Sequence, residues 1–325
     1  MNTVGIVLKT SFAIIGTVIG AGFISGREII TFFKGDMLVS SILLCVIFFL
    51  AFYFLLTLKN LPDSKLLICF QPLILVGNLI TLSGMISAVD EVFFSITDGF
   101  VKIPFFSVII LIFSYFLMKK GIGGLKIINT ILVPSIIVVT LVITLIFSSL
   151  SYSVTFEIPT GKLVAYVGMN TFMSSTVFID LGKDLNKKQA LYTSLISSGV
   201  LCLFIFFIYS ALVASPVEIR DSAVPMLARL KNLKVLYYIF SVIMLFGIVT
   251  TLFSAHYPLF CFAQTFPRSK IANAVVLIAA FAISRFGFYN IVNYLYPFLG
   301  ASGAIYIITV AILSNISRRV KRQNT

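Results

Sequence analysis

Four glycines and a charged pair interrupt the first apolar segment of this chain. The glycines lie in residues 16–26, and Arg27 and Glu28 follow them directly. Each glycine lowers helix stability by about 1 kcal/mol relative to alanine, so the cluster predicts an interrupted helix with free backbone groups. In hydrocarbon such groups are tolerated only where they face protein or a water-filled cavity, and broken helices of this kind build the central sites of many secondary transporters. The sequence therefore predicts a solute or ion site here. Close helix packing through small residues is the alternative.

Charged side chains inside apolar segments are a second signal, because each costs about 2.5–3.5 kcal/mol at mid-bilayer. Glu28 could pair with Arg27, neutralise the amine of a solute, or carry a proton. Asp90 is a second candidate for such a coupling charge, whereas we expect its neighbour Glu91 to reach water at the end of its segment. His256, the single histidine, is expected to be a hydrogen-bonded structural residue, with a pH-dependent role as the alternative.

Composition excludes a soluble domain, because 59% of the residues are hydrophobic, 11% are charged and the mean hydropathy is +1.10. The four cysteines lie in apolar segments without metal-ligand spacing, so neither a disulfide framework nor a zinc site is predicted. We expect an all-α polytopic membrane protein.

Ten apolar stretches have roughly the length that crosses a membrane as an α-helix, about 20 residues. They are residues 6–32, 38–58, 66–96, 104–118, 125–149, 161–181, 190–214, 234–262, 271–285 and 289–314. If all ten cross, both termini share one side, and that side carries 15 of the 24 Lys and Arg residues. By the positive-inside rule we expect a multi-pass cell-membrane protein with both termini in the cytoplasm. The net charge of +13 then reflects topology and contact with lipid headgroups, and nucleic acid is not an expected partner.

A second interrupted stretch is predicted five crossings later. Residues 166–176 place polar side chains in mid-membrane, among them Asn170, Ser174 and Ser175. These side chains would lie across a cavity from the glycine cluster. Hydrogen bonding between helices, without any ligand, is the alternative.

Two interruptions an odd number of crossings apart predict an inverted repeat. The first repeat is residues 1–150, the second is residues 151–316, and residues 317–325 form a basic cytoplasmic tail. The two broken helices would meet near the midplane, where N-terminal helix ends suit a carboxylate and carbonyl ends suit a cation.

The opening motif resembles a known family. Gly16-Thr-Val-Ile-Gly-Ala-Gly-Phe23 and Ser25-Gly-Arg-Glu-Ile29, with the segment near Asn170 and its Leu181-Gly182 ending, resemble the YkvI-like membrane proteins of the amino acid, polyamine and organocation (APC) transporter superfamily. The resemblance covers essentially the whole chain in the number and order of spans. It implies a LeuT-type fold, a five-plus-five inverted repeat in which helices 1 and 6 are broken.

The same resemblance implies a sodium ion held between helices 1 and 8. Positional mapping gives main-chain oxygens of Gly16, Ile19 and Gly247 and side chains of Thr250 and Thr251 as its ligands. Bonding of the threonines to carbonyls of their own helix is the alternative. Some related proton-coupled transporters replace this ion with a lysine on helix 5, but here stretch 125–149 has only Lys126 at its edge, which favours sodium over protons.

The constellations of a membrane enzyme are absent from the sequence. One histidine excludes a His-Glu-x-x-His zinc site, and neither Asp90 nor Asp180 lies in a supporting glycine motif. A receptor or sensor built on a transporter fold stays open as a third class, because binding and transport use the same residues.

The sequence therefore predicts a sodium-coupled secondary transporter of a small solute, with an amino acid or related amine as the favoured class and proton coupling as the alternative. The residues expected to bind the solute are Gly20, Gly22, Ser25, Asn170, Ser174 and Ser175. Apart from sodium we expect no cofactor, and apart from the solute and membrane lipid no obligate partner.

Overall fold

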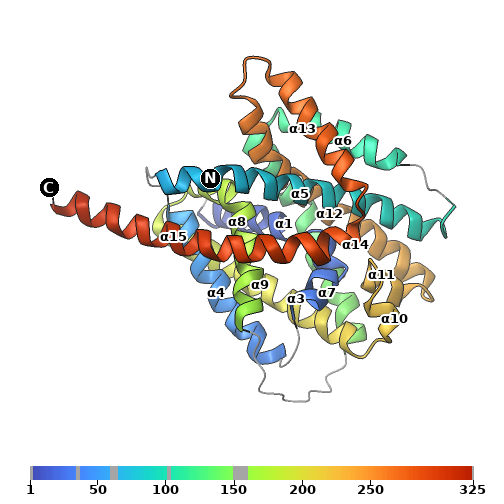
Figure 1. The fold of residues 1–325 in the computed structure, drawn as a ribbon. Helices are drawn as coiled ribbons and strands as arrows, with labels where there is room; N and C mark the ends of the chain where they lie inside the picture. Colours follow the sequence, from blue (N-terminus) through green and yellow to red (C-terminus); the bar gives the residue numbers. More distant parts are fainter. Residues whose placement is uncertain (1–2, 34–36, 59–64, 101–103, 149–159, 324–325) are drawn as a thin grey trace.

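All regular structure in the described part of the chain is helical, as the sequence predicts (Figure 1). The computed structural model describes residues 3–33, 37–58, 65–100, 104–148 and 160–323, and it describes only the backbone at 37–38, 65–69 and 315–323. The side chains of the predicted basic tail, 317–325, therefore lie outside the described part.

The longer helices are α1 (Thr3–Val18), α4 (Met37–Thr57), α5 (Lys65–Ile96), α6 (Phe105–Met118), α7 (Gly121–Phe147), α8 (Thr160–Gly182), α9 (Lys187–Val213), α12 (Lys234–Ala263), α13 (Ser269–Ser284) and α15 (Tyr296–Gln323). The shorter segments are α2 (Ala21–Ile24), α3 (Arg27–Phe32), α10 (Val217–Arg220), α11 (Pro225–Leu230), α14 (Phe288–Asn290) and the π-helix η1 (Ile291–Leu295).

Six segments of the described chain are long and apolar enough to cross a membrane. They lie in α4, α5, α7, α9, α12 and the stretch from α14 to Ser314, while α1, α6 and α13 are shorter apolar helices. Each of these segments overlaps one of the ten predicted stretches, and α8 overlaps the remaining one. The structure thus supports a multi-pass membrane protein. The count of ten crossings, the inverted repeat, its boundaries and the cytoplasmic placement of the termini remain predictions.

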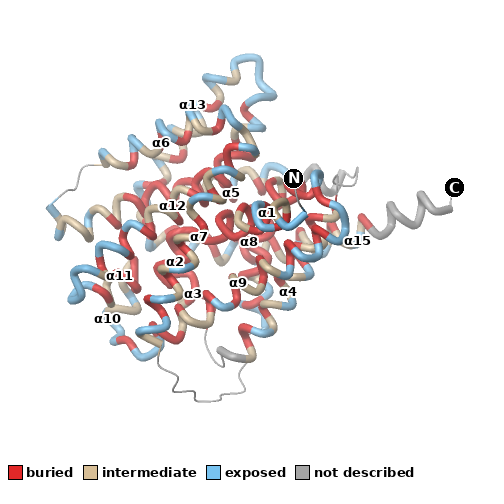
Figure 2. The backbone as a smooth tube through the Cα atoms, turned by 180° about the vertical axis from the view of Figure 1, so that it is seen from behind, coloured by how far each residue is buried: buried red, intermediate tan, exposed pale blue. Residues whose placement is uncertain are grey.

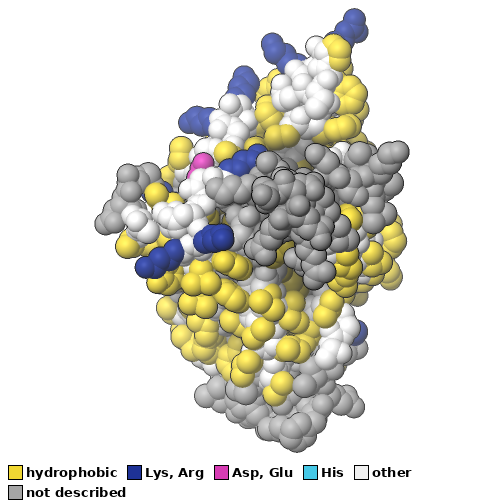
Figure 3. All heavy atoms as spheres, turned by 90° about the vertical axis from the view of Figure 1, so that its left-hand side faces the viewer, with side chains coloured by type: hydrophobic (Ala, Val, Ile, Leu, Met, Phe, Trp, Pro, Cys, Tyr) yellow, Lys and Arg dark blue, Asp and Glu magenta, His cyan; other side chains and the backbone are white. Residues whose placement is uncertain are grey.

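Many residues of α1, α8 and α12 are buried in the middle of the molecule, whereas α6 and α13 lie along one edge (Figure 2). Apolar side chains at that edge are largely exposed, including Ile109 and Ile112 of α6 and Val275 and Ile278 of α13. A second face of the molecule also carries a broad area of hydrophobic side chains (Figure 3). Lysines and arginines lie above this area in the view. Such extensive apolar surface suits contact with hydrocarbon.

The predicted break in the first helix is confirmed. Helix α1 ends at Val18, and α2 begins at Ala21 after Gly20, whose backbone is extended. A second interruption separates α2 from α3 at Gly26, where φ is +80°, a left-handed conformation that favours glycine. The glycine cluster therefore produces an interrupted helix, as its composition predicts.

The predicted break in the second polar stretch is wrong, because α8 runs unbroken through residues 166–176. The polar side chains there bond to carbonyls of their own helix: Asn170 Nδ2 donates to Tyr166 O at 2.9 Å and Ser175 Oγ to Phe172 O at 2.8 Å. Side chains that are satisfied in this way leave the backbone hydrogen bonds of the helix intact.

Gly168, the glycine of residues 166–176, lies where α8 contacts small residues of α15. A Cβ atom added to Gly168 would lie 2.6 Å from Ala304 N and 2.9 Å from Gly300 O. Gly303 in turn approaches Gly168 O so closely that a Cβ there would be 2.2 Å away. Gly168 is therefore required for close packing of two backbones.

Replacing Gly168 with leucine is expected to destabilise the protein, because the new side chain would meet backbone atoms that cannot move aside. Overpacking of this kind costs about 1–3 kcal/mol. Thermal unfolding of the purified protein should show a lower midpoint for Gly168→Leu than for the control Gly199→Leu, since a Cβ at Gly199 meets nothing within 4 Å. Equal midpoints for the two variants would contradict the close approach of α8 and α15.

Candidate functional site

A small cavity lies beside the break in the first helix. Its volume is about 30 Å³, space for about two water molecules. Of the residues singled out from the sequence it is lined by Gly20, Glu28, Asn170, Ser174 and Thr251. The structure thus brings together the glycine cluster, the acidic member of the charged pair and the polar stretch of α8.

Further lining residues were missed by the sequence analysis, among them Thr17, Asn78, Thr81, Met85, Ser254 and Tyr296. Asn78 is an amide inside the apolar stretch 66–96, and that polarity was a signal that could have found it. Tyr296 is one of 13 tyrosines, and nothing in its sequence position sets it apart. Its hydroxyl is buried beside Thr81 without a hydrogen bond of good geometry.

Hydrogen-bond acceptors dominate the cavity wall. Asn78 Nδ2 donates to Ile74 O at 2.8 Å and to Met173 O at 3.1 Å, and the amide nitrogen of Asn170 donates to Tyr166 O. A backbone carbonyl cannot donate, so these contacts fix which end of each amide is nitrogen. Two donor bonds of Asn78 and one of Asn170 therefore point at the backbone, and the oxygens of both amides remain for a ligand.

Glu28 adds a carboxylate to the same wall. The residue is 4% exposed and, within the described chain, its side chain accepts one hydrogen bond, from the Tyr166 hydroxyl at 3.4 Å. None of the ion pairs found in the described part of the chain involves it. Gly22 makes room for this carboxylate, since a Cβ there would lie 2.2 Å from Glu28 Oε1. A buried carboxylate without a cation suits a positively charged ligand.

Arg27, the neighbour of Glu28, binds elsewhere. Its Nη2 and Nε donate to Asn293 Oδ1 at 2.8 and 3.2 Å, and its Nη1 donates to Arg220 O at 3.0 Å. The guanidinium also lies over the ring of Tyr289, 4.1 Å from its centre. Arg27 therefore ties α3 to η1 and to the end of α10, and it does not pair with Glu28.

Oxygen atoms converge where the end of α1 meets α12. Thr251 Oγ1 donates to Gly16 O at 3.2 Å and approaches Thr17 O at 3.4 Å, and Ser254 Oγ donates to Thr17 Oγ1 at 2.9 Å. These are neutral carbonyl and hydroxyl oxygens, the hard donors that a sodium ion prefers. The chemistry of this donor set fits the predicted ion.

The five predicted ion ligands differ in their contacts with this group of oxygen atoms. Gly16 and Thr251 are in contact, and Gly247 lies next to Ile19 O, which is 3.2 Å from the position of an added Cβ. The Thr250 hydroxyl donates to Gly247 O of its own helix at 2.9 Å, which is the alternative considered for it. Thr17 and Ser254 are oxygen donors that the sequence analysis missed.

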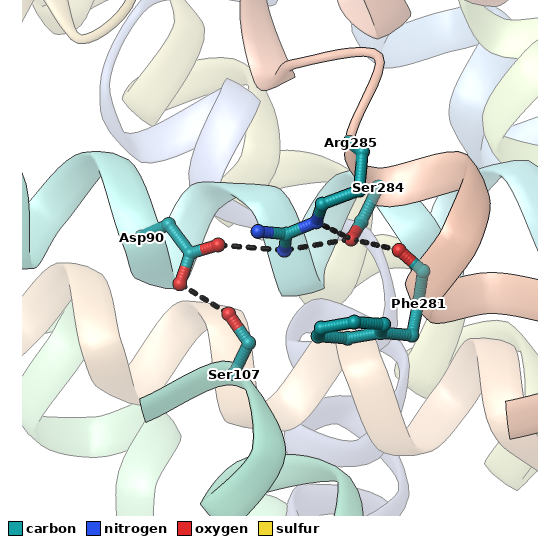
Figure 4. A network of polar contacts seen from close by, with 5 residues as sticks. All are labelled: Asp90, Ser107, Phe281, Ser284 and Arg285. Atoms are coloured by element: carbon teal, nitrogen blue, oxygen red, sulfur yellow. Dashed lines mark hydrogen bonds and ion pairs between the residues drawn. The ribbon is translucent and has the colours of Figure 1, made fainter. Parts of the chain in front are cut away.

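Asp90 lies outside the cavity. Its carboxylate pairs with Arg285 at 2.7 Å and accepts a hydrogen bond from Ser107, as Figure 4 shows for the contact of α5, α6 and α13. Ser284 donates to Phe281 O in the same network. The structure therefore places Asp90 in a partly exposed ion pair and not beside Glu28.

Two predicted solute ligands also have other contacts. Ser25 Oγ donates to Gly22 O at 3.3 Å, and Ser25 O accepts from Met226 N of α11. Ser175 bonds to its own helix and does not line the cavity. By contrast, Ser174 lines the cavity and makes no hydrogen bond within the described residues, so its hydroxyl is available to a ligand.

His256 is a hydrogen-bonded structural residue, as the sequence predicts. Its Nδ1 lies 2.6 Å from Ser114 Oγ of α6, and its Nε2 lies 2.9 Å from Asn273 Oδ1 of α13. The ring is fully buried and joins three helices.

Comparison with known proteins identifies a fold. No family model matches the chain. A solved structure of Mhp1, a nucleobase-cation-symport-1 family transporter, in a closed conformation with bromovinylhydantoin bound, matches with a TM-score of 0.53. The match covers 93% of this chain and 76% of that one at 16% sequence identity. The chain has a transporter fold.

The uncharacterized protein YyaD of Bacillus subtilis (strain 168) is 23% identical over 339 residues, covering 96% of this chain and 98% of YyaD. The likeness to Mhp1 agrees with the prediction that the protein is not an enzyme, because Mhp1 is a transporter. Membership of the YkvI-like family is not confirmed by either comparison.

Replacing Asn293 with leucine is expected to destabilise the protein, because the buried Arg27 guanidinium would lose the acceptor of two hydrogen bonds. Such a loss costs about 1–3 kcal/mol. Asn293→Asp keeps an acceptor oxygen of the same size and should retain the stability of the natural protein. The measurement is the midpoint of thermal unfolding, and equal destabilisation by both variants would contradict the acceptor role of Asn293.

Proposed function

We propose that this protein is a LeuT-type secondary active transporter of a small amine-bearing solute, coupled to sodium. The observation that carries the proposal is the buried Glu28 carboxylate, which lines a cavity beside a broken helix and has no cationic partner in the described chain. The transporter fold supports the same conclusion, since a likeness to Mhp1 extends over 93% of the chain.

The acceptor-rich cavity favours an amine over a solute that mainly accepts hydrogen bonds. A protonated amine would donate to the Glu28 carboxylate and to the oxygens of Asn78 and Asn170, whose amide nitrogens donate to backbone carbonyls. The Ser174 hydroxyl could donate or accept, so it suits a second polar group on the solute. Gly20 lines the cavity and would let the backbone approach the solute closely, whereas Gly22 makes room for the Glu28 carboxylate.

Sodium coupling would act through the oxygens between α1 and α12. Gly16, Thr17, Thr251 and Ser254 are the residues that would hold the ion, with the Ile19 carbonyl adjacent. A bound ion would contribute positive charge at the end of α1, where helix carbonyls carry partial negative charge. Because the Thr251 hydroxyl donates to Gly16 O, ion binding would require its hydrogen to turn away from that carbonyl, so that both oxygens could face the ion.

Alternating access explains the small size of the cavity. A volume of about 30 Å³ is too small for an amino acid, so a solute of that size would require the cavity to enlarge. Movement of the elements that contain the broken helix against the rest of the bundle would enlarge the cavity and open it to one side at a time. Proton coupling is the second candidate, favoured by the same carboxyl group at Glu28. A sensor on this fold would bind the solute without opening to both sides.

A panel of amines, amino acids and nucleobases tests the function by thermal stabilisation of the purified protein, in sodium or with choline replacing it. A ligand that binds the folded state raises the unfolding midpoint by mass action. We expect an amine-bearing solute to raise the midpoint in sodium and less in choline. Glu28→Gln should weaken its binding at least about ten-fold, as loss of a charged hydrogen bond implies.

Thr193→Val is a matched control for the panel, because the Thr193 hydroxyl is buried without a partner and lies outside the cavity. A solute effect that persists in Glu28→Gln would exclude Glu28 as the counter-ion. Solute stabilisation that depends on pH and not on sodium would favour proton coupling, and flux into proteoliposomes would separate transport from sensing.

Thr251→Val is expected to raise the sodium concentration needed for half-maximal stabilisation by about five-fold or more, because a single oxygen ligand contributes on the order of 1 kcal/mol. The measurement is a sodium titration of the unfolding midpoint at fixed solute concentration. Thr193→Val should leave the titration unchanged. The same sodium dependence in both variants would remove Thr251 from the ion site.

A further inference from the structure

A second hollow lies away from the central cavity, between the first turns of α1 and α7. Its volume is about 570 Å³. On α7 its wall follows one helical face from Gly123 to Ile131, about 12 Å along the axis at 1.5 Å per residue. Ile6 and Lys9 line it from α1, and Asp184 lines it from the turn after α8. The groove of α1 and α7 is therefore elongated and open at the surface.

The groove carries one positive charge that is not compensated within the described chain. Lys126 pairs with Asp184 at 2.7 Å, so these two charges compensate each other. Lys9 is exposed and forms no ion pair in the described chain, which leaves one uncompensated ammonium group. The first turn of the 27-residue helix α7 contains no acidic residue and adds the positive end of the helix dipole. Lys9 and the start of α7 therefore both favour an anion in the groove.

The rest of the groove is apolar. Ile127 and Ile131 are 56% and 67% exposed on α7, one turn apart on the same face. The hydroxyls of Thr10 and Thr130, which also line the groove, donate to carbonyls of their own helices and so offer little to a ligand. A free phosphate ion would gain nothing from this wall, whereas an acyl chain would bury it.

We propose that the groove of α1 and α7 binds an anionic phospholipid, with its phosphate beside Lys9 and an acyl chain along Ile127 and Ile131. The position fits, because the groove begins at the charged start of α7 and continues into a segment apolar enough to span the membrane. Basic pockets at the ends of transmembrane helices bind anionic headgroups through the same combination of charge and apolar contact. This proposal does not depend on the solute or the coupling ion.

The test measures thermal unfolding of the full-length protein in neutral detergent with added phosphatidylglycerol, phosphatidylcholine or inorganic phosphate. Phosphatidylglycerol should raise the midpoint more than phosphatidylcholine, and inorganic phosphate should have no effect. Lys9→Gln should weaken the apparent affinity for phosphatidylglycerol about five-fold, the factor expected for one basic residue. Lys270→Gln, at an exposed lysine of α13 outside the groove, should leave that affinity unchanged.

Gly123→Leu tests the shape of the groove without changing its charge. A Cβ at Gly123 meets nothing within 4 Å, so leucine should extend into the groove, leave the unfolding midpoint without lipid unchanged or higher, and abolish the preference for phosphatidylglycerol. Gly199→Leu is the matched control on α9. An unchanged lipid response in both Lys9→Gln and Gly123→Leu would overturn the proposal. An equal shift with inorganic phosphate would also overturn it in favour of a simple anion site.

Discussion

The break at the end of α1 is the constraint on which the centre of this protein depends. A helix that stops inside a membrane leaves carbonyl groups that water cannot reach, and each must find another donor. Here the Thr251 hydroxyl of α12 reaches Gly16 O, and Ser254 reaches the Thr17 hydroxyl. The requirement to satisfy α1 therefore sets the contact between α1 and α12, and it gathers oxygen atoms at the place where a cation would bind.

The interrupted stretch of the first helix and the polar stretch of α8 have opposite effects on the backbone. In the first helix the glycines interrupt the backbone and free its groups. In α8 the helix continues, and Asn170 and Ser175 use their donors on carbonyls of the same helix. Gly168 serves a third purpose, which is the close approach of α15. The wall of the cavity between these elements consequently presents several acceptors, among them the Glu28 carboxylate, and these acceptors favour a ligand that brings N–H groups.

Arg27 and Glu28 are adjacent in the chain and separate in space. Successive side chains of a helix point about 100° apart, so the side chains of residues i and i+1 do not face each other. Arg27 points to Asn293 and to the carbonyl of Arg220, whereas Glu28 points to the cavity. The arginine therefore stabilises the packing of α3, and the carboxylate is left for a ligand.

The sequence alone determined the membrane class, the helical content and the interruption of the first helix, because hydropathy and glycine are local properties of the chain. It also placed Gly20, Asn170 and Ser174 in one solute site, and the family resemblance placed Thr251 beside the first helix as an ion ligand. It could not decide that α8 continues, since a polar stretch in hydrocarbon can break a helix or bond to it, and only the packing against α15 distinguishes the two. The tertiary structure likewise added Asn78 and Tyr296 to the cavity and moved Asp90 to an ion pair with Arg285. Those assignments depend on which helices meet, and long-range contacts decide that.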